Sequence, residues 1–478
     1  MDRSASVFGN QIPKKTVKKA NKNKKKYIKK FGDDSNVDYK LGFEKIESLD
    51  FIDAQNIVVK KENEKFPENG LIVGNIRMGF GHYRISIAMA SCAKAMGYQP
   101  LWLDLASFDA TGSKVIRTQN DLYSLGSRIS QKSKLFNHFV WEVFNRDVFK
   151  QLVYNPGDQR NAELLTPIFR NIPKDTPYIA THAWPSQGAI HAGMTHVVNA
   201  IPDNWPMALH LSEGAIHTVQ TSFGYYGYKR LDGFDKKRNL KHIPDDQIKY
   251  VGHYVDHEIV SNLEEDTSYR LKRLENNEPI RILLTVGGAG AGQKQFMEIL
   301  KHLLPYVKQD KVALFINFGD HLKVYEYLCK EIKGYKDYPT YFDKYDEFKD
   351  FVSKMNEGSI KGVYNIFHKD IFPAVYSTNL LMRKCDLLIT KPSELVFYPI
   401  PKIFMRHIGG HEVFSAYYGK EIGDATYECD TTKKMNAMLD DFIYDKALLK
   451  NMNEQILRLN KMGLYNGAYE CVKLATKK

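Results

Sequence analysis

Two glycine-rich turns are the segments of this sequence whose residue types and spacing best suit chemistry. Each follows a run of apolar residues and precedes a stretch with helical periodicity. A glycine turn at the start of a helix lets backbone N–H groups approach a phosphate closely. The two turns therefore predict two anion-binding positions, one in each half of the chain. They are Gly79-Phe80-Gly81-His82 and Gly287-Gly288-Ala289-Gly290.

The first turn nearly matches the Gly-x-Gly-x-x-Gly pattern of dinucleotide-binding proteins. Arg84 stands in place of the third glycine, and Asp104 ends the next apolar run, where an acid that binds ribose would sit. The missing glycine and the second turn count against an NAD-dependent oxidoreductase, which stays open as a competing interpretation. Neither turn ends in Gly-Lys-Ser/Thr, so a P-loop NTPase is not expected.

The elements that must position these turns follow a simple pattern. From about residue 70, short apolar runs alternate with helical stretches, which predicts an α/β protein with parallel, doubly wound sheets. The pattern stops at a polar segment and then restarts, so we expect two Rossmann-like domains that face a cleft. The predicted boundaries are a disordered lysine-rich arm (1–45), an N-terminal domain (46–262), a linker (263–279), a C-terminal domain (280–445), and a C-terminal helix that packs back on the N-terminal domain (446–478).

The charge of the chain is concentrated at one end. Lys and Arg total 68 against 56 Asp and Glu, a net charge of +12. Residues 1–30 hold ten lysines and Arg3 against Asp2 alone, which gives +10 and leaves about +2 for the remainder. The body is therefore close to neutral, and only the arm is expected to contact an anionic surface or a nucleic acid.

Several classes of protein are not expected. No apolar run reaches the length of about 18 residues that a membrane-spanning helix needs. The lysine-rich start has no apolar segment typical of a secretory signal. The five cysteines form no Cys-x-x-Cys pair, which favours reduced thiols in the cytoplasm and no metal or redox cofactor.

The second half carries a family resemblance. Glu394, Pro401, the pair His411-Glu412 and Ala416 follow one another with the spacing of the donor-site region of GT-B glycosyltransferases of family 28. This family includes peptidoglycan N-acetylglucosaminyltransferases and monogalactosyldiacylglycerol synthases. The two glycine turns and the segment 252–255 are similar to further motifs of that family. The chain departs from the pattern at Pro392-Ser393, where glycines are usual, and at His411-Glu412, where glutamines are usual.

The resemblance implies a GT-B fold and transfer of a sugar from a nucleotide sugar, UDP-linked, to a hydroxyl acceptor with inversion. It also implies a lipid-linked acceptor, so the arm could hold the enzyme at the inner, anionic face of a membrane. Glu394 would bind the ribose hydroxyls, and His411 and Glu412 would contact the donor sugar. The implied diphosphate- and base-binding residues are Gly287, Gly288, Gly290, Phe367, Lys391 and Ser393.

A transfer of this kind needs a base for the acceptor hydroxyl. His82 is the first candidate because it lies at the tip of the turn and imidazole titrates near neutral pH. Asp203, which follows the apolar run 196–201, is the second candidate. Gly79 and Gly81 would approach the acceptor or a phosphate.

Two other functions stay open. A UDP-sugar 2-epimerase would keep the GT-B fold and use extra carboxylates in the cleft, for which Glu412 is a candidate. A protein without catalytic activity could instead use the basic arm to bind nucleic acid.

Overall fold

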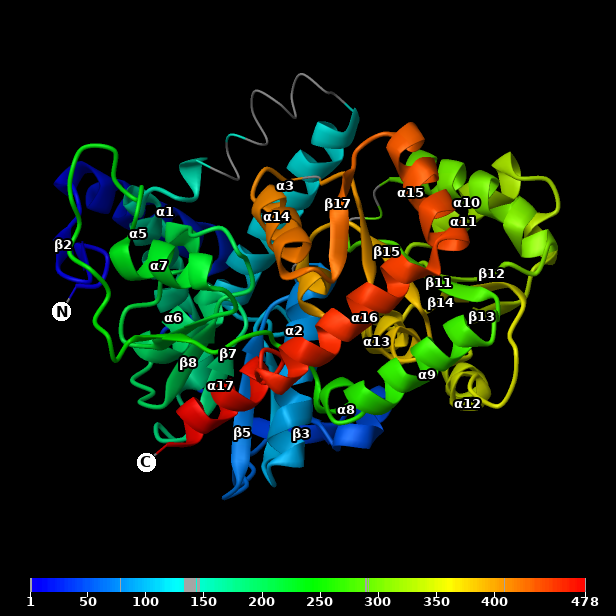
Figure 1. Ribbon diagram of the computed structural model, residues 1–478. Coiled ribbons are helices and arrows are strands. Elements are labelled where there is room, and N and C mark those ends of the chain that lie inside the picture. The colour runs from blue at the N-terminus through cyan, green and yellow to red at the C-terminus, as the bar shows by residue number, and fades with distance from the viewer. Residues whose placement is uncertain are drawn as a thin grey trace.

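The computed structural model describes residues 2–77, 79–132, 143, 147–288, 290, 292–407 and 409–477. Two α/β halves lie side by side, and the last two helices run diagonally across both of them (Figure 1). The predicted α/β class with two parallel, doubly wound sheets is confirmed, and this is the arrangement expected of a GT-B fold.

The first half is built on a sheet of eight strands in the order β10-β9-β8-β7-β5-β6-β4-β3. All neighbouring pairs are parallel except β3 with β4. The central strand β5 (Gly70–Asn75) is buried at every position, as expected for a strand covered on both faces by helices. The other strands are β3 (Leu41–Lys45), β4 (Gln55–Val59), β6 (Gln99–Asp104), β7 (Tyr178–Ala180), β8 (Val197–Ala200), β9 (Ile216–Val219) and β10 (Ile248–Tyr250).

The second half contains a parallel sheet of seven strands in the order β13-β14-β12-β11-β15-β16-β17. Its central strand β11 (Ile280–Thr285) is again buried at every position. The other strands are β12 (Val312–Asn317), β13 (Thr340–Phe342), β14 (Gly362–Phe367), β15 (Leu387–Thr390), β16 (Lys402–Met405) and β17 (Ala425–Cys429).

Helices cover both sheets. In the first half they are α1 (Lys14–Phe31), α2 (Phe80–Ala95), α3 (Thr111–Lys132), α5 (Asn155–Ala162), α6 (Ala183–His191) and α7 (Ser222–Arg230). The chain continues through α8 (His257–Val260), α9 (Leu263–Glu275), α10 (Gln293–Lys308), α11 (Leu322–Glu331), α12 (Tyr345–Lys354), α13 (Ile371–Met382), α14 (Glu412–Ile422), α15 (Thr432–Tyr444), α16 (Lys446–Lys461) and α17 (Gly467–Thr476). None of these described helices is both long and apolar enough to cross a membrane.

The last helix belongs in space to the first half. Helix α17 packs on α2, β7 and β8, and its Cys471 Sγ lies 3.3 Å from the Thr218 hydroxyl of β9. Helix α16 packs instead on α9 of the second half. The C-terminal segment therefore connects the two halves a second time.

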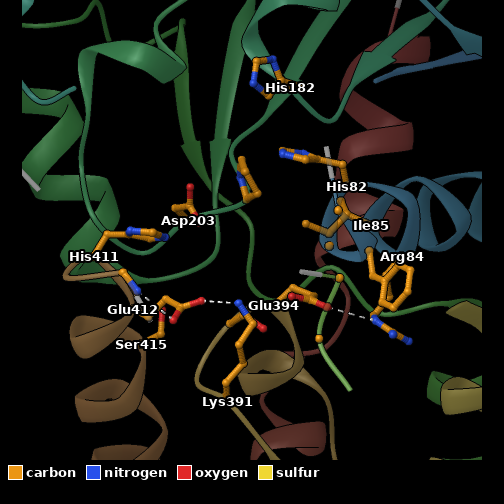
Figure 2. A pocket seen from close by; sticks show the side chains of 18 of the residues that line it. His82, Arg84, Ile85, His182, Asp203, Lys391, Glu394, His411, Glu412 and Ser415 are labelled. Atoms are coloured by element: carbon orange, nitrogen blue, oxygen red, sulfur yellow. Dashed lines mark hydrogen bonds and ion pairs between the residues drawn. The ribbon is translucent and has the colours of Figure 1, made fainter. Parts of the chain in front are cut away.

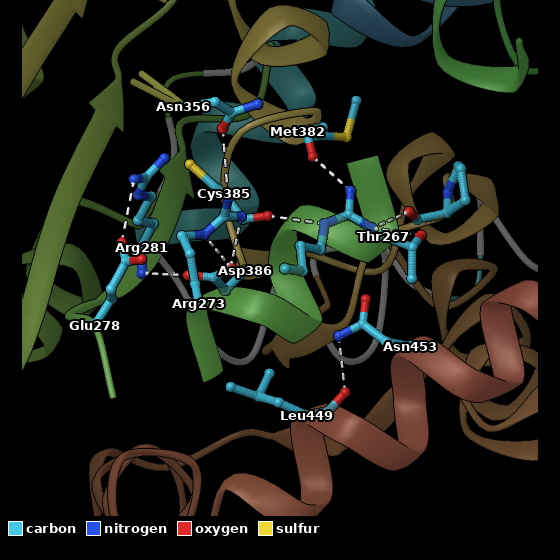
Figure 3. A network of polar contacts seen from close by, with 12 residues as sticks. Thr267, Arg273, Glu278, Arg281, Asn356, Met382, Cys385, Asp386, Leu449 and Asn453 are labelled. Atoms are coloured by element: carbon cyan, nitrogen blue, oxygen red, sulfur yellow. Dashed lines mark hydrogen bonds and ion pairs between the residues drawn. The ribbon is translucent and has the colours of Figure 1, made fainter. Parts of the chain in front are cut away.

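Helix α9 occupies most of the segment that the sequence predicts to be a linker, and buried arginines attach it to the second sheet (Figure 3). Arg273 contacts Asp386 at the start of β15 through two nitrogens, at 2.7 and 3.0 Å from one carboxylate oxygen. The other oxygen of Asp386 accepts from the backbone N–H of Arg281, 2.8 Å away. Arg270 donates to the backbone carbonyls of Met382, Cys385 and Pro399. These contacts make α9 a packed part of the second half.

The structure corrects the expected disorder of residues 1–45. Residues 14–31 form helix α1, which packs on α5 and α3, and β1 (Ser6–Val7) pairs with β2 (Asn10–Gln11). Lys24 reaches Glu163 at 2.6 Å. The lysine content suggested a chain without apolar anchors, but Val17, Ala20 and Ile28 recur at helical spacing and turn one face of α1 inward.

Candidate functional site

A cavity of about 740 Å³ lies where the carboxyl ends of both sheets meet, and both halves contribute residues to its wall (Figure 2). Strand β5 lies between β6 and β7, and β11 lies between β12 and β15, so the strand order reverses beside each of them. Ligands of open α/β sheets bind at the carboxyl ends of strands at such points. The cavity therefore occupies the position at which both sheets are suited to bind a ligand.

The two glycine turns contact each other at this cavity. A Cβ on Gly288 would lie 2.6 Å from the backbone nitrogen of Phe80 and 3.0 Å from Cα of Gly79. Gly79 itself has φ of +86°, which favours glycine. The phenyl ring of Phe80 lies against Gly319, where an added Cβ would be 2.4 Å from the ring. Glycine is therefore required at position 288 because the two halves approach backbone to backbone there, at position 79 because of its backbone conformation, and at position 319 because the ring of Phe80 leaves no room for a side chain.

His82 follows the first turn and faces the cavity from the first half. Its Nδ1 lies 2.8 Å from the backbone carbonyl of Thr181, which can only accept, so Nδ1 carries the proton of the neutral ring. Nε2 is therefore the acceptor. Burial lowers the pKa of His82 below its ordinary value of 6.5, while Thr181, Asp203 and Glu394 oppose the shift. The neutral ring is thus the main form at pH 7.

Two more histidines and Asp203 lie near His82. His182, the second residue after β7, accepts from the backbone N–H of Trp184 at Nδ1, and its ring centroid lies 5.1 Å from that of His82. His210 Nε2 lies 3.0 Å from the carboxylate of Asp203. Burial alone would raise the pKa of Asp203, but the hydrogen bond from His210 and the nearby His411 hold it below its usual range. Asp203 is therefore an ionised group that orients His210.

Lys391 and Glu412 form an ion pair at the floor of the cavity. Lys391 Nζ lies 2.6 Å from Glu412 Oε1, and Glu412 is buried at the first turn of α14. Burial alone would lower the pKa of Lys391, but Glu412, and then Glu394 and Asp203, raise it above its ordinary value. The cavity therefore contains a permanent ammonium group that is held beside a carboxylate.

Glu394 reaches across from the second half to the first (Figure 2). Its Oε1 lies 3.5 Å from Nε of the buried Arg84 in α2, and a Cβ on Gly81 would lie 3.2 Å from its Oε2. Arg84 also donates to the backbone carbonyl of Val375 and to the side chain of Asn379 in α13. The carboxylate thus lines the cavity while it joins the two halves.

An aromatic contact joins the halves at another place. The ring of Trp205 in the first half stacks on that of Phe414 in α14, with centroids 4.0 Å apart. The Asn204 side chain donates to the Phe414 carbonyl at 3.1 Å. With the Arg84–Glu394 pair, this contact holds the structure in a closed arrangement around the cavity.

Part of the cavity wall is apolar and belongs to the first half. The wall extends to Tyr27 of α1 and Leu122 of α3, and Leu122 is 63% exposed. The cavity therefore reaches the surface beside these helices. The further large side chains on this wall are Phe149, Tyr154, Trp184, Met207 and Leu209.

Most of the residues singled out in the sequence lie together in this cavity. Gly290 packs on His321 and Phe367 is 4% exposed in the core of the second half; neither is among the lining residues. The backbone N–H of Ser393 donates to the Lys391 carbonyl at 2.8 Å, so the structure shows that group already engaged. The residues singled out in the sequence that do line the cavity are Gly79, Gly81, His82, Asp203, Gly287, Gly288, Lys391, Ser393, Glu394, His411 and Glu412.

Sequence reasoning missed His182 and the roles of Arg84 and His210. His182 follows a predicted strand immediately, and residues at the carboxyl ends of parallel strands meet at one edge of the sheet. Its position therefore could have identified it as a site residue. The partners of Arg84 and His210 lie far along the chain or across a loop, and no local pattern indicates them. Among the described residues, no group of three or more His, Cys, Asp or Glu side chains is placed to hold a metal ion.

Comparisons with families of known sequences match each half of the chain to a separate family model. Residues 6–230 match a family model described as a domain of unknown function (DUF6937), and residues 243–476 match another described as a domain of unknown function (DUF6938). No curated protein matches the chain. Neither description names glycosyltransferase family 28, so that resemblance stays a prediction.

Solved structures similar to the chain include an epimerase, a synthase and a transferase. One is the UDP-GlcNAc 2-epimerase of Neisseria meningitidis bound to UDP-GlcNAc, with 10% identity, a TM-score of 0.46, and coverage of 86% of this chain and 100% of that chain. Another is the trehalose 6-phosphate synthase of Burkholderia multivorans, with 9% identity, a TM-score of 0.43, and coverage of 85% and 98%. A third is a spinosyn forosaminyltransferase, with 11% identity, a TM-score of 0.37, and coverage of 85% and 100%.

Proposed function

We propose that this protein transfers a sugar from a UDP-sugar to a hydroxyl acceptor, with inversion at the anomeric carbon. The observation that carries the proposal is the pairing of groups in one cavity. His82 of the first half has its acceptor nitrogen defined by Thr181. A glycine turn and an ammonium group of the second half line the same cavity. A base and a site for a diphosphate leaving group are the two requirements of this reaction.

His82 is the general base in this account. The acceptor oxygen forms a bond to the anomeric carbon, and its proton passes to Nε2 of His82. The bond between the anomeric carbon and the diphosphate oxygen breaks, and its electron pair leaves with UDP. Asp203, the other candidate, is a weaker base because its pKa is held below the ordinary value. We assign it to the positioning of His210.

The second half holds the donor. The Gly287-Gly288 turn allows a diphosphate to approach the backbone, and Lys391 offsets the negative charge that develops on the leaving group. Glu394 accepts hydrogen bonds from the ribose hydroxyls of the bound nucleotide, and these bonds replace its contact with Arg84. His411 and Glu412 contact the donor sugar. The chemistry requires no metal because Lys391 and the turn supply the positive potential.

The acceptor carries an apolar portion next to its hydroxyl group. The wall beside His82 contains Trp184, Met207 and Leu209, and it extends to the exposed Leu122. A wall of this kind stabilises an acceptor by removing apolar surface from water. A lipid alcohol fits this description.

A second candidate function is the 2-epimerisation of a UDP-sugar. The observation that favours it is the number of proton-exchanging groups in the cavity, where Asp203, Glu412 and His182 accompany His82. Epimerisation consumes no acceptor and conserves the UDP-sugar, whereas transfer releases UDP in proportion to the acceptor used.

The experiment that separates these functions measures UDP release and sugar products from UDP-glucose, UDP-galactose and UDP-N-acetylglucosamine. Each donor is incubated with a short-chain diacylglycerol in detergent, with a water-soluble alcohol, or with no acceptor. Acceptor-dependent UDP release that is lost in His82→Gln supports transfer. Conversion of the donor to a second UDP-sugar without acceptor supports epimerisation instead.

A further inference from the structure

Helix α1 presents one strongly cationic face to solvent. With 3.6 residues per turn, nine of its ten lysines fall within an arc of about 160°. All nine are exposed, whereas Lys24 lies on the opposite face and is paired with Glu163. They are Lys14, Lys15, Lys18, Lys19, Lys22, Lys25, Lys26, Lys29 and Lys30. We call these nine residues the lysine face.

The lysine face is held in place by the body of the protein. Ala20 of α1 is buried, and the helix packs on α5 and α3. The segment before it is attached as well, because Asp2 pairs with Arg160 at 2.7 Å and Arg3 donates to the Glu213 carbonyl at 2.6 Å. The charges are therefore fixed relative to the cavity rather than spread over a mobile tail.

An exposed apolar stripe lies on the neighbouring helix α3. Leu122, Leu125 and Ile129 are 63%, 48% and 41% exposed. At helical spacing they fall within an arc of about 60°, so they form one stripe. Figure 1 shows α1 in blue and α3 in cyan on the same side of the first half. Large apolar side chains in a contiguous stripe on the surface indicate an interaction site.

Both helices contribute to the cavity that holds His82. At 3.6 residues per turn, Tyr27 lies on α1 about 60° beyond one edge of the lysine face. It is half-buried there and lines the cavity together with Leu122 of the apolar stripe. A surface that the lysine face and the stripe contact would thus lie at the edge of the cavity and beside its apolar wall.

We propose that the lysine face and the apolar stripe together form a surface that adsorbs to an anionic lipid bilayer and receives the acceptor from it. Lysines attract anionic headgroups, and the apolar side chains enter the boundary between headgroups and acyl chains. A nucleic acid would match the lysines but would leave Leu125 and Ile129 without a partner. The adsorption stands on its own, and only the delivery of an acceptor rests on the proposed function.

The test is sedimentation of the full chain with vesicles. Vesicles of phosphatidylcholine alone are compared with vesicles that contain about one-third phosphatidylglycerol, at about 0.1 M and about 0.5 M salt. The expected result is binding to the anionic vesicles at low salt and its loss at high salt. A fluorescent single-stranded RNA and a DNA duplex are titrated under the same conditions.

Two variants and their controls locate the surface. Changing Lys15, Lys18, Lys22, Lys25 and Lys29 to Gln should lower the vesicle binding constant at least about 100-fold. Changing Leu125 and Ile129 to Ser should lower it at least about fivefold, with activity on a water-soluble acceptor retained. The matched control carries the same number of Lys→Gln changes on α10, on α11 and just after α11, and it should bind vesicles as the wild type does. The lysines changed in this control, all of them exposed, are Lys301, Lys308, Lys323, Lys330 and Lys333.

The results separate this inference from the proposed function. Salt-sensitive vesicle binding that depends on both sets of residues supports the surface even if no sugar transfer is found. Equal loss in the α10 and α11 control would contradict it, because total charge rather than the lysine face would be responsible. Binding to RNA or DNA without binding to anionic vesicles would overturn it, whatever the enzyme does.

Discussion

His82 Nδ1 donates to the backbone carbonyl of Thr181 across 2.8 Å, and this bond leaves Nε2 as the accepting atom of the ring. Thr181 directly follows β7, and His82 lies in the first turn of α2, the helix that follows β5 and the glycine turn. The neighbouring ends of two paired strands thus fix the tautomer of the proposed base.

Replacement of His82 should remove the chemical step and spare donor binding. The His82→Gln variant keeps a polar side chain but offers no base, so kcat should fall by about 10²–10⁴-fold. The dissociation constant for UDP should stay within about threefold, because the nucleotide contacts lie in the other half. Kinetics with saturating donor check the first value and calorimetry checks the second. His242→Gln, on the exposed surface, is the control. Retention of kcat would exclude His82 as the base.

The pH dependence of the reaction should report the same group. Burial lowers the pKa of His82 below 6.5, so the basic, neutral ring is the main form at pH 7. Because a base must be unprotonated, kcat/KM should fall as the pH drops through the lowered pKa, and the midpoint of this acidic limb should lie below pH 6.5. An acidic limb centred above pH 7 would contradict the assignment.

Glu394 should control donor affinity. The Glu394→Gln variant loses the charge that accepts from the ribose hydroxyls, and the dissociation constant for UDP should rise at least tenfold, about 1.4 kcal/mol. Calorimetry with UDP and with UMP measures the change, which should be similar for both because both contain the ribose. Glu421→Gln is the matched control, since Glu421 is an exposed carboxylate next to Lys420. An unchanged affinity would remove Glu394 from the donor site.

The buried contacts of Asp386 should contribute to stability and not to ligand contact. In Asp386→Ala, Arg273 is left as a buried charge without its carboxylate, and the backbone N–H of Arg281 loses its acceptor. The free energy of unfolding should fall by about 3–5 kcal/mol. Chemical denaturation measures it, with the exposed Asp350→Ala as control, expected within about 0.5 kcal/mol of the wild type. A loss below about 1 kcal/mol would show that the contacts of Asp386 in Figure 3 do not stabilise the folded protein as expected.

The sequence predicts the central part of each sheet well and its margins poorly. Runs such as 71–76 and 280–286 are apolar throughout because strands covered on both faces have no polar side to present, and they became β5 and β11. Strand β17 lies at the edge of its sheet and has one exposed and one half-buried residue, and β3 pairs antiparallel, so neither resembles the central strands. The sequence did not predict helix α1, because its many lysines suggested a disordered segment and only a few apolar residues attach the helix to the body.

The candidate site was predictable to the extent that it lies at strand ends. His82, Asp203 and Lys391 each follow a strong apolar run, and the rule that ligands bind at the carboxyl ends of parallel strands brings them together. The sequence could not predict that Glu394 reaches Arg84, or that Gly288 lies against Gly79, because these contacts depend on how the two halves close. The packing of β14 likewise decides that the ring of Phe367 points into the core, and a contact from its backbone to the base of a nucleotide stays a prediction.

The most direct test of the central claim is titration calorimetry of the wild-type protein with UDP, a UDP-sugar and NAD. The account predicts saturable binding of UDP and the UDP-sugar at one site per chain, weakened at least tenfold in Glu394→Gln, with no binding of NAD. Binding of NAD with no binding of UDP or of any UDP-sugar would contradict the account, because the cavity would then belong to a dinucleotide-dependent enzyme.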